Sequence, residues 1–311
     1  MKRITTVTMN PAVDKSARVE QITANDKLRA THVRRDAGGG GINVSRAIVH
    51  LGGQSVAVFV SGGVEGELLE RLLGHDDIEQ RRIEVAQPVR ENLTVVETTT
   101  GRQYRFGMPG PHLSRTEVDE ARRVIGEQIT SDGYLVASGS LSPGVPDDFY
   151  AALARTAREH DARFIVDTSG PPLHAAINEG AFLIKPNLRE LAGLVGQETL
   201  EGQQVREAAE ALVARGAAEY VVVSLGSGGA WFVSADGAEK LASPTVAVES
   251  RIGAGDSMVA GMVLALDRGQ SILDAVRYGT AAGAAAVMDA ETGLGSREHV
   301  DRLYQQLQAE A

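Results

Sequence analysis

The chain has 311 residues, a formal net charge of −10, and 43% hydrophobic residues. This length and composition favour one large α/β domain, or a large domain with a small appendage. The negative charge argues against nucleic acid as a main partner, because binding to a phosphate backbone needs a basic face. The absence of cysteine excludes a disulfide framework, a thiolate nucleophile and a cysteine-ligated metal.

The chain contains no apolar run that approaches the roughly 20 residues needed to span a bilayer. Its first nine residues are typical of a short strand and lack the pattern of a signal peptide. We therefore expect a soluble cytoplasmic protein without a membrane partner.

Short apolar runs alternate with amphipathic stretches along most of the chain. The predicted strands are 4–9, 56–60, 134–137, 164–167, 182–185, 220–225 and 231–233. The predicted helices include 43–51, 68–73, 117–129, 149–160, 205–215 and 272–288, and the third begins with a capping box formed by Ser114 and Glu117. This alternation predicts a mostly parallel sheet with helices on both of its faces.

Two segments depart from this alternation, because 19–35 and 89–108 are typical of strands without an intervening helix. Within the second segment, 93–98 and 103–106 flank a turn at Thr100-Gly101, which predicts a β-hairpin. We infer a small accessory sheet inserted in the first third of the chain. The alternative is an ordinary hairpin at the edge of the main sheet.

A glycine turn, Gly253-Ala254-Gly255-Asp256, precedes small apolar residues that predict a buried helix over 257–266. The first N–H groups of a helix lack intrahelical partners and lie at the positive end of its dipole, so they bind phosphate. Asp256 adds a carboxylate that can accept a proton, and transfer of a phosphoryl group to a hydroxyl requires both features. The alternative is a turn in which Asp256 only complements the helix dipole.

A second glycine cluster, 38–41, precedes the helix that is predicted to start near Asn43. Glycines leave the backbone open to a ligand, and the amide of Asn43 both donates and accepts hydrogen bonds, which suits a polyol. A dinucleotide-binding fingerprint is the rival interpretation. It fails on position, because that loop follows the first strand closely and an acidic residue comes about 20 residues later.

Two further turns follow predicted strands and suit a nucleotide and its metal ion. Asn187 and Glu190 lie three residues apart at a helix start, where their side chains suit Mg²⁺ held through water. The alternative is a simple helix start with Glu190 as a capping partner. The glycine-rich turn from Ser224 fits nucleotide phosphate or ribose, and it is not a Walker A loop because no Gly-Lys-Ser/Thr follows.

The segments predicted as accessory strands carry three cations, Lys27, Arg90 and Arg105. If they converge, they form a site for a second phosphate with bidentate arginine contacts. The alternative is a solvated face or an edge strand protected by charge. Asp14 follows the first predicted strand, where open α/β sheets place ligand contacts, and a structural turn is the equal alternative.

These motifs together resemble the ribokinase-like sugar kinases of the phosphofructokinase-B type. Residues 39–45, followed by Gly52 and Gly62, resemble the first signature of that family, and residues 253–256 resemble the second. Residues 185–190 are similar to its Asn-x-x-Glu element, and residues 138–144 to its Ser-Gly-Ser-x-x-Pro-Gly loop. Within the family, residues 8–14 and 104–110 are most similar to the phosphosugar kinases.

The resemblance covers essentially the whole chain and implies an α/β fold, with a ribokinase-like, Rossmann-like, mostly parallel sheet and helices on both faces. It implies one kinase domain over residues 1–311, with an inserted β-sheet lid formed by about 12–36 and 88–108. Such a lid would close the site and pair with the lid of a second copy, so we expect a homodimer.

The motifs and the resemblance together assign roles to individual residues. Asp256 is expected to be the catalytic base, with an anion hole of Gly253, Ala254 and Gly255. The residues expected to bind the sugar phosphate are Asp14, Lys27, Gly39, Gly40, Asn43, Arg90, Asn92, Arg105 and Ser140. The residues expected on the ATP side are Lys185, Asn187, Ser224, Gly226, Gly229, Thr280 and Ala284, with Asn187 and Glu190 holding Mg²⁺ through water.

The resemblance also implies a monovalent-cation site, for K⁺, near the second signature. The matching positions here are Ser250, Ile252, Ala286 and Asp289. The chain departs from the family pattern at this place, because Arg251 replaces the usual Thr and the second loop carries Asp289 and Glu291. A bulky cation at Arg251 argues against activation by potassium.

The expected function is ATP-dependent phosphorylation of fructose 6-phosphate at its 1-hydroxyl, which gives fructose 1,6-bisphosphate. The alternatives on the same fold are phosphorylation of tagatose 6-phosphate or fructose 1-phosphate. A sensor that binds a sugar phosphate without turnover is the alternative from another class. The presence of Asp256, Asn187 and Glu190 argues against the sensor.

Overall fold

The computed structural model describes residues 2–250, 252–289 and 293–309. Nine strands form the main sheet in the order β13-β12-β11-β10-β9-β8-β1-β4-β5. Their bounds are β1 Ile4–Thr8, β4 Val56–Ser61, β5 Glu79–Glu84, β8 Tyr134–Ser138, β9 Arg163–Asp167, β10 Ala181–Ile184, β11 Ala218–Ser224, β12 Ala230–Ser234 and β13 Gly237–Leu241. Within this sheet the neighbouring strands β11, β10, β9, β8, β1, β4 and β5 pair in parallel, whereas β12 pairs antiparallel with both β11 and β13. The predicted parallel sheet is therefore confirmed.

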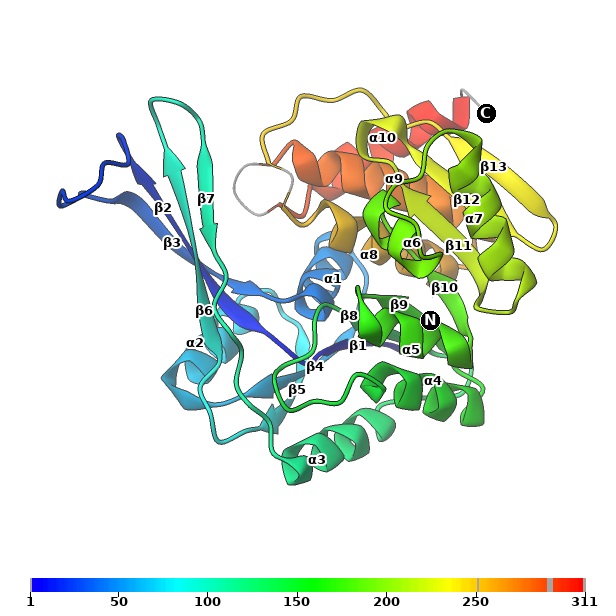
Figure 1. Ribbon diagram of the computed structural model, residues 1–311, viewed down its shortest axis with the longest axis horizontal. Helices are drawn as coiled ribbons and strands as arrows, with labels where there is room; N and C mark the ends of the chain where they lie inside the picture. The colour runs from blue at the N-terminus through cyan, green and yellow to red at the C-terminus, as the bar shows by residue number, and fades with distance from the viewer. Residues whose placement is uncertain (1, 251, 290–292, 310–311) are drawn as a thin grey trace.

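Helices cover both faces of this sheet (Figure 1). Their bounds are α1 Gly40–His50, α2 Gly63–Gly74, α3 Arg115–Gly126, α4 Phe149–Glu159, α5 Pro171–Glu179, α6 Leu188–Leu194, α7 Gln203–Ala214, α8 Ala254–Asp267, α9 Ile272–Val287 and α10 Arg297–Ala309. Strand β8 shows why both faces must be covered, because Leu135 belongs to one apolar cluster and Val136 to another. Helices α3 to α7 contribute to the first cluster, and α1, α8, α9 and α10 to the second.

A separate sheet of four strands stands beside the main one, in the order β3-β2-β6-β7 (Figure 1). Its strands are β2 Ala12–Val19, β3 Thr31–Gly38, β6 Arg90–Glu97 and β7 Gln103–Phe106. Strands β6 and β7 pair antiparallel around the predicted turn, so the hairpin is confirmed and its placement at the edge of the main sheet is wrong. The expected strand over 19–35 is only partly correct, because residues 21–30 form a loop and β2 and β3 flank it.

A third apolar cluster joins the root of the four-stranded sheet to the rest of the molecule. The small sheet contributes Val13 and Ala37, while Ile42 comes from α1 and Phe59 from β4. All four are buried, with exposed fractions of 3% or less. The root of the small sheet is thus packed as tightly as a protein core, whereas its far end projects away from the main sheet (Figure 1).

The elements that were not expected lie at the margins of the fold. Strand β5 pairs with β4 but buries only Ile83 among six residues, so its polar sequence carries almost no apolar signal. A polar edge strand of this kind also protects the sheet from pairing with other chains.

None of the helices in the described part of the chain is long and apolar enough to cross a membrane.

Candidate active site

Helix α8 begins at the carboxyl-terminal edge of the main sheet, and Gly253 caps it. Gly253 has a left-handed conformation with φ of 78°, and a Cβ there would overlap the carbonyl oxygen of Gly293. The first intrahelical bond is donated by Ser257 N–H to the Gly253 carbonyl. The N–H groups before Ser257, including those of Ala254 and Gly255, therefore have no partner within the helix and form an anion-binding end.

Asp256 lies in the first turn of α8 and is bound by the N-terminal turn of α1. Asn43 Nδ2 donates to Asp256 Oδ2 at 2.9 Å. Helix α1 can approach because Gly40 lacks a side chain, and a Cβ there would overlap Ser138 Oγ and Gly139 N. The glycine cluster was expected to leave room for a ligand, and in the structure it leaves room for the backbone that follows β8. The positive ends of α1 and α8 therefore lie at the same carboxyl group.

The carboxyl group of Asp256 has an unusual affinity for its proton. Burial and the nearby charge of Asp167 raise its pKa to about 7, against the lowering effects of Asn43, Lys185 and Ser138. A carboxyl group with a pKa close to neutral pH can both accept and release a proton at that pH. This is the property expected of a general base.

Lys185 supplies positive charge at the same place. Its side chain is 6% exposed, and its Nζ lies 3.3 Å from Asp167 Oδ1. A Cβ at Gly255 would lie 3.4 Å from Lys185 Nζ, so the ammonium borders the anion-binding end of α8. Although burial lowers the pKa of Lys185, the charges of Asp167, Glu190 and Asp256 raise it above its ordinary value and keep the ammonium charged.

A cavity of about 200 Å³ opens between these groups. Its walls come from the ends of β8 and β9 and the starts of α6 and α8. The residues that line it are Ser138, Gly139, Ser140, Asp167, Thr168, Ser169, Glu190 and Asp256. Asp256, Glu190 and the expected sugar ligand Ser140 are therefore brought together around one space.

Sequence reasoning missed Asp167 and Thr168 in this wall, and it identified Ser138 only as part of the loop 138–144. The available signal was positional, because Asp167 ends a strand that was predicted over 164–167. The carboxyl ends of neighbouring parallel strands meet at one edge of a sheet, where ligands bind. In the structure Thr168 Oγ1 donates to the Gly139 carbonyl at 2.9 Å, and Gly139 N–H donates to the Asp167 carbonyl at 3.0 Å.

Asn187 and Glu190 form the start of α6 as a capping box. Glu190 N–H donates to Asn187 Oδ1 and Asn187 N–H donates to Glu190 Oε2, both at 2.9 Å. Glu190 is therefore a capping partner, as the alternative interpretation held, and it also lines the cavity. Burial raises the pKa of Glu190 above its ordinary value, the adjacent Asp167 charge adds to this, and its bonds to Asn187 oppose it.

The other residues expected on the nucleotide side lie on neighbouring elements. Ser224 forms a bridge with Asn187, and its N–H donates to the Pro186 carbonyl at 3.0 Å. Gly226 begins the short 3-10 helix η1 Gly226–Gly228, and Gly229 ends it. Thr280 and Ala284 are buried on α9, where Thr280 Oγ1 donates to the Val276 carbonyl within the same helix.

One face of the small sheet gathers four of the residues expected to bind the sugar phosphate, which are Asp14, Arg90, Asn92 and Arg105. Asp14 accepts a hydrogen bond of 2.8 Å from Asn92 Nδ2 on the neighbouring strand. Burial raises the pKa of Asp14, whereas Asn92 and the positive charges of Arg90 and Arg105 lower it. Arg90 donates to the backbone carbonyls of residues 10, 11 and 108 at 3.0–3.4 Å, so part of its guanidinium is already engaged.

Lys27 and Ser140 lie at opposite ends of this region. Lys27 is exposed in the loop between β2 and β3. That loop lies at the far end of the small sheet (Figure 1). Ser140 Oγ borders the cavity and accepts a hydrogen bond of 3.0 Å from Asn10 Nδ2. Gly39 caps the start of α1. The structure thus places Ser140 at the cavity and Lys27 far from it within one chain.

The two loops expected to hold a monovalent cation lie next to each other. Ser250 N–H donates to the Val287 carbonyl at 3.1 Å, and Ile252 N–H donates to Ser250 Oγ at 3.2 Å. Asp289 N–H donates to the Ala286 carbonyl at 3.2 Å. Arg251 and Glu291 lie outside the described residues. Among the described residues, no group of three or more His, Cys, Asp or Glu side chains is arranged to hold a metal ion by itself.

The family model for the pfkB family of carbohydrate kinases matches residues 7–298. The chain belongs to this family of carbohydrate kinases. The match includes the small sheet, the cavity wall and the N-terminus of α8, so the site described above lies entirely within the matched part of this pfkB-family chain.

Two bacterial relatives show where the chain falls within the pfkB family. It is 42% identical over 303 residues to the ATP-dependent 6-phosphofructokinase isozyme 2 of Mycobacterium tuberculosis, covering 97% of this chain and 89% of that protein. It is 41% identical over 305 residues to the isozyme 2 of Escherichia coli, covering 98% of both chains. Sequence likeness of this kind spans all of the elements that form the site.

Crystal structures of the E. coli phosphofructokinase-2 have the same fold. The structure in complex with potassium matches with a TM-score of 0.95 at 41% identity and covers 99% of this chain and 100% of that one. The structure in complex with fructose-6-phosphate matches with a TM-score of 0.93 over the same shares. The E. coli protein has also been solved as a tetrameric inhibited form, with a TM-score of 0.94.

The raised pKa of Asp256 predicts a pH dependence. A base acts when deprotonated, so kcat/KM should fall as the pH drops through about 7. Asn43→Ala removes a hydrogen bond that favours the ionised form and should move this acidic limb upward by roughly half to one pH unit. Steady-state rates between pH 5 and 9 measure the limb. The exposed Asn178→Ala is the control, and an unmoved limb in Asn43→Ala would contradict the assignment.

Proposed function

We propose that the protein transfers the γ-phosphoryl group of ATP to the 1-hydroxyl of fructose 6-phosphate. The observation that carries this proposal is the carboxyl group of Asp256, with a pKa of about 7, at the anion-binding end of α8 and beside Lys185. The 41–42% identity to two 6-phosphofructokinases of isozyme 2 supports the choice of acceptor.

Asp256 accepts the proton of the attacking hydroxyl. The transition state of phosphoryl transfer is loose, so positioning and neutralisation of charge dominate, and the base contributes partly by orienting the hydroxyl. Asn43 holds one carboxyl oxygen of Asp256 at 2.9 Å, and the Asp256 side chain borders the cavity. The proton is then released to solvent when the products leave.

The N–H groups of Gly253, Ala254 and Gly255 stabilise the transferring phosphoryl group. Their charge is fixed in place before the reaction, so no reorganisation is needed when negative charge develops. The ammonium of Lys185, beside Gly255, adds a full positive charge on the same side. It faces Asp167 as well, which holds the ammonium in position without neutralising the whole site.

The chemistry of Glu190, Asp167 and Asn187 suits Mg²⁺. Their oxygens are the hard ligands that this ion prefers, and Mg²⁺ retains several waters in such sites. Burial raises the pKa of Glu190 and the adjacent charge of Asp167 adds to this, so a bound cation would favour the ionised carboxylate. Asn187 and Glu190 would hold the ion through water, where it would neutralise phosphate charge.

The sugar phosphate binds between the cavity and the small sheet. Asp14, Gly39, Gly40, Asn43, Asn92 and Ser140 hold the sugar. Arg90 has five N–H groups, of which carbonyls accept three, so it offers the remainder to the phosphate together with Arg105. Lys27 lies far from the cavity within one chain, so it would reach the phosphate only from the paired lid of a second copy. Ser224, Gly226, Gly229, Thr280 and Ala284 line the nucleotide side.

A panel of acceptors tests this function. ADP release is measured with fructose 6-phosphate, tagatose 6-phosphate, fructose 1-phosphate, fructose and a nucleoside, each in K⁺ and in Na⁺ buffer. We expect the highest kcat/KM with fructose 6-phosphate and, because of Arg251, equal rates in the two buffers.

A higher kcat/KM with another acceptor would overturn the proposed substrate. Binding of one sugar phosphate without turnover of any would favour the sensor. Faster turnover in K⁺ would show that Arg251 does not block a potassium site.

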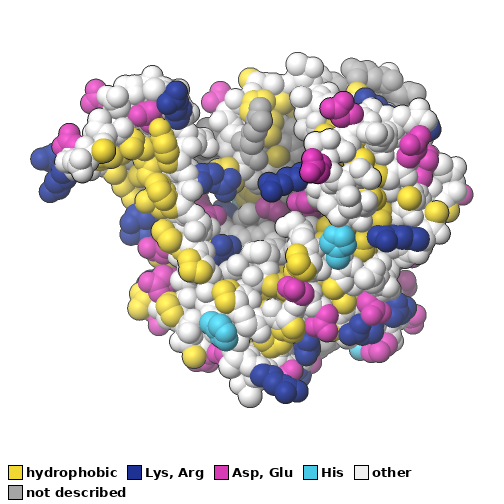
Figure 2. Space-filling view, in the orientation of Figure 1, with side chains coloured by type: hydrophobic (Ala, Val, Ile, Leu, Met, Phe, Trp, Pro, Cys, Tyr) yellow, Lys and Arg dark blue, Asp and Glu magenta, His cyan; other side chains and the backbone are white. Residues whose placement is uncertain are grey.

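We also propose that the small sheet acts as a lid and pairs with the lid of a second copy in a homodimer. Strand alternation places Leu93 and Phe106 on the face opposite to that of Asp14 and Asn92. Phe106 is 49% exposed on β7, and Val33 is 53% exposed on β3 at the other edge of the sheet. Hydrophobic side chains gather over this sheet (Figure 2), and an exposed apolar patch of this kind marks an interaction surface.

Sedimentation equilibrium of the wild type and of Phe106→Asp tests the dimer. A charge buried in the paired lids would oppose association, so the wild type should sediment as a dimer and Phe106→Asp largely as a monomer at micromolar concentration. Val64→Asp is the matched control, because Val64 is 69% exposed on α2. A wild type that is monomeric, or a Phe106→Asp that associates as the wild type does, would contradict the proposal.

A further inference from the structure

Helix α1 carries a second polar side chain that reaches beyond the helix, one turn after Asn43. Arg46 is 8% exposed and lies three residues after Asn43, so the two side chains leave neighbouring parts of the helix surface. Asn43 binds Asp256 Oδ2 at 2.9 Å, whereas Arg46 Nη1 donates to the Ala37 carbonyl of β3 at 3.0 Å. One helix therefore contacts both the candidate base and the small sheet.

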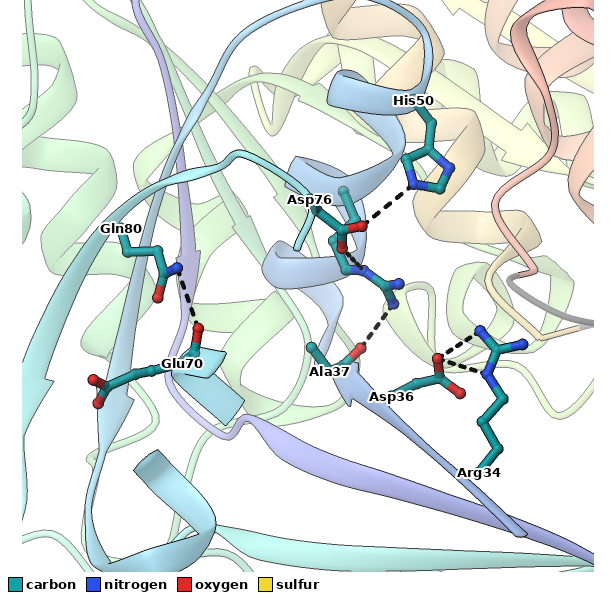
Figure 3. A network of polar contacts seen from close by, with 8 residues as sticks. Arg34, Asp36, Ala37, His50, Glu70, Asp76 and Gln80 are labelled. Atoms are coloured by element: carbon teal, nitrogen blue, oxygen red, sulfur yellow. Dashed lines mark hydrogen bonds and ion pairs between the residues drawn. The ribbon is translucent and has the colours of Figure 1, made fainter. Parts of the chain in front are cut away.

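The other side of the Arg46 guanidinium is held by an acidic residue. Arg46 Nε lies 2.5 Å from Asp76 Oδ2, and His50 Nε2 lies 3.6 Å from Asp76 Oδ1. Figure 3 draws Asp76, His50 and Ala37 around this contact. Although burial raises the pKa of Asp76, its contacts with His50 and Arg46 lower it below the ordinary value, so this carboxylate stays charged.

Ala37 is the residue of β3 at which the small sheet reaches α1. It follows Asp36, which pairs with Asp14 across β2 and β3, and it precedes Gly38, the last residue of β3. Ala37 is 3% exposed, and its side chain packs with Ile42 and Phe59 in the cluster under the root of the sheet. The hydrogen bond from Arg46 to the Ala37 carbonyl therefore fixes the end of β3, the strand whose Asp36 pairs with Asp14.

Only an arginine can hold both partners. Its planar guanidinium presents several N–H groups in a fixed fork, whereas the ammonium of lysine is a compact charge. A lysine at position 46 would keep a charge for Asp76 but would lose the second, directed bond to the Ala37 carbonyl. The arrangement is thus more specific than a buried ion pair that only contributes to stability.

We propose that Arg46 is a positioning residue, which sets the foot of β3, and with it Asp14, relative to α1 and the bound Asp256. This inference rests on the proposed function only in assuming that Asp14 and its neighbours bind the acceptor sugar. The acceptor face and the base are then aligned by one helix, through Asn43 on one side and Arg46 on the other.

Steady-state kinetics of three variants test the inference. Arg46→Lys and Arg46→Gln should raise KM for fructose 6-phosphate by about 10- to 100-fold, the range expected for the loss of a hydrogen bond from a charged donor, and should leave KM for ATP within twofold. Asp76→Asn should raise KM for the sugar less than threefold, because the amide oxygen still accepts from Arg46. Arg155→Gln, which breaks an ion pair with Glu179 on the outer surface, is the control.

Amide hydrogen exchange gives a readout that does not depend on activity. The backbone amides of residues 31–39 should exchange faster in both Arg46 variants than in the wild type, and at the wild-type rate in Arg155→Gln. An unchanged KM for the sugar in Arg46→Lys, or an equal rise in both KM values, would overturn the inference. If the wild type does not turn over fructose 6-phosphate, the proposed function fails instead, and the exchange data still show whether Arg46 fixes β3.

Discussion

The hydrogen bond between Asn43 and Asp256 is the contact on which the rest of the site depends. It joins the first turns of α1 and α8, two helices that cover the same face of the main sheet and share one apolar cluster. Each helix presents its positive end to the carboxyl group, which partly offsets the cost of burying it. The base is therefore held by the architecture of the fold and not by a flexible loop.

The cavity region contains more carboxylate groups than ammonium groups. Asp256, Asp167 and Glu190 lie close enough for each to influence the ammonium of Lys185, which cannot neutralise all three. Burial raises the pKa values of Asp256 and Glu190, and the nearby charge of Asp167 raises both further. A site with surplus negative charge favours a metal cation, and the N–H groups at the start of α8 can donate to the phosphate that such a cation would accompany.

Most of the fold could be predicted because its parallel strands are continuous apolar runs between amphipathic helices. Strand β5 escaped prediction because it buries only Ile83. At the site, glycine turns and the start of α6 indicated the correct places, since they follow strands. The contacts of Asn43 with Asp256, 213 residues apart, and of Arg46 with Ala37 could not be predicted, because no local pattern records which helices meet.

The central claim is that Asp256 is the base of the transfer reaction, and the kcat of Asp256→Asn tests it most directly. The amide keeps the shape and cannot accept the proton, so kcat should fall by about 10²–10⁴-fold.

The folded state binds the Asp256 proton more tightly than the unfolded chain does, because folding raises its pKa from 3.8 to about 7. Ionisation therefore lowers stability as the pH rises through this window, and the variant should unfold at no lower denaturant concentration than the wild type at pH 8. A folded Asp256→Asn with wild-type kcat would contradict the account.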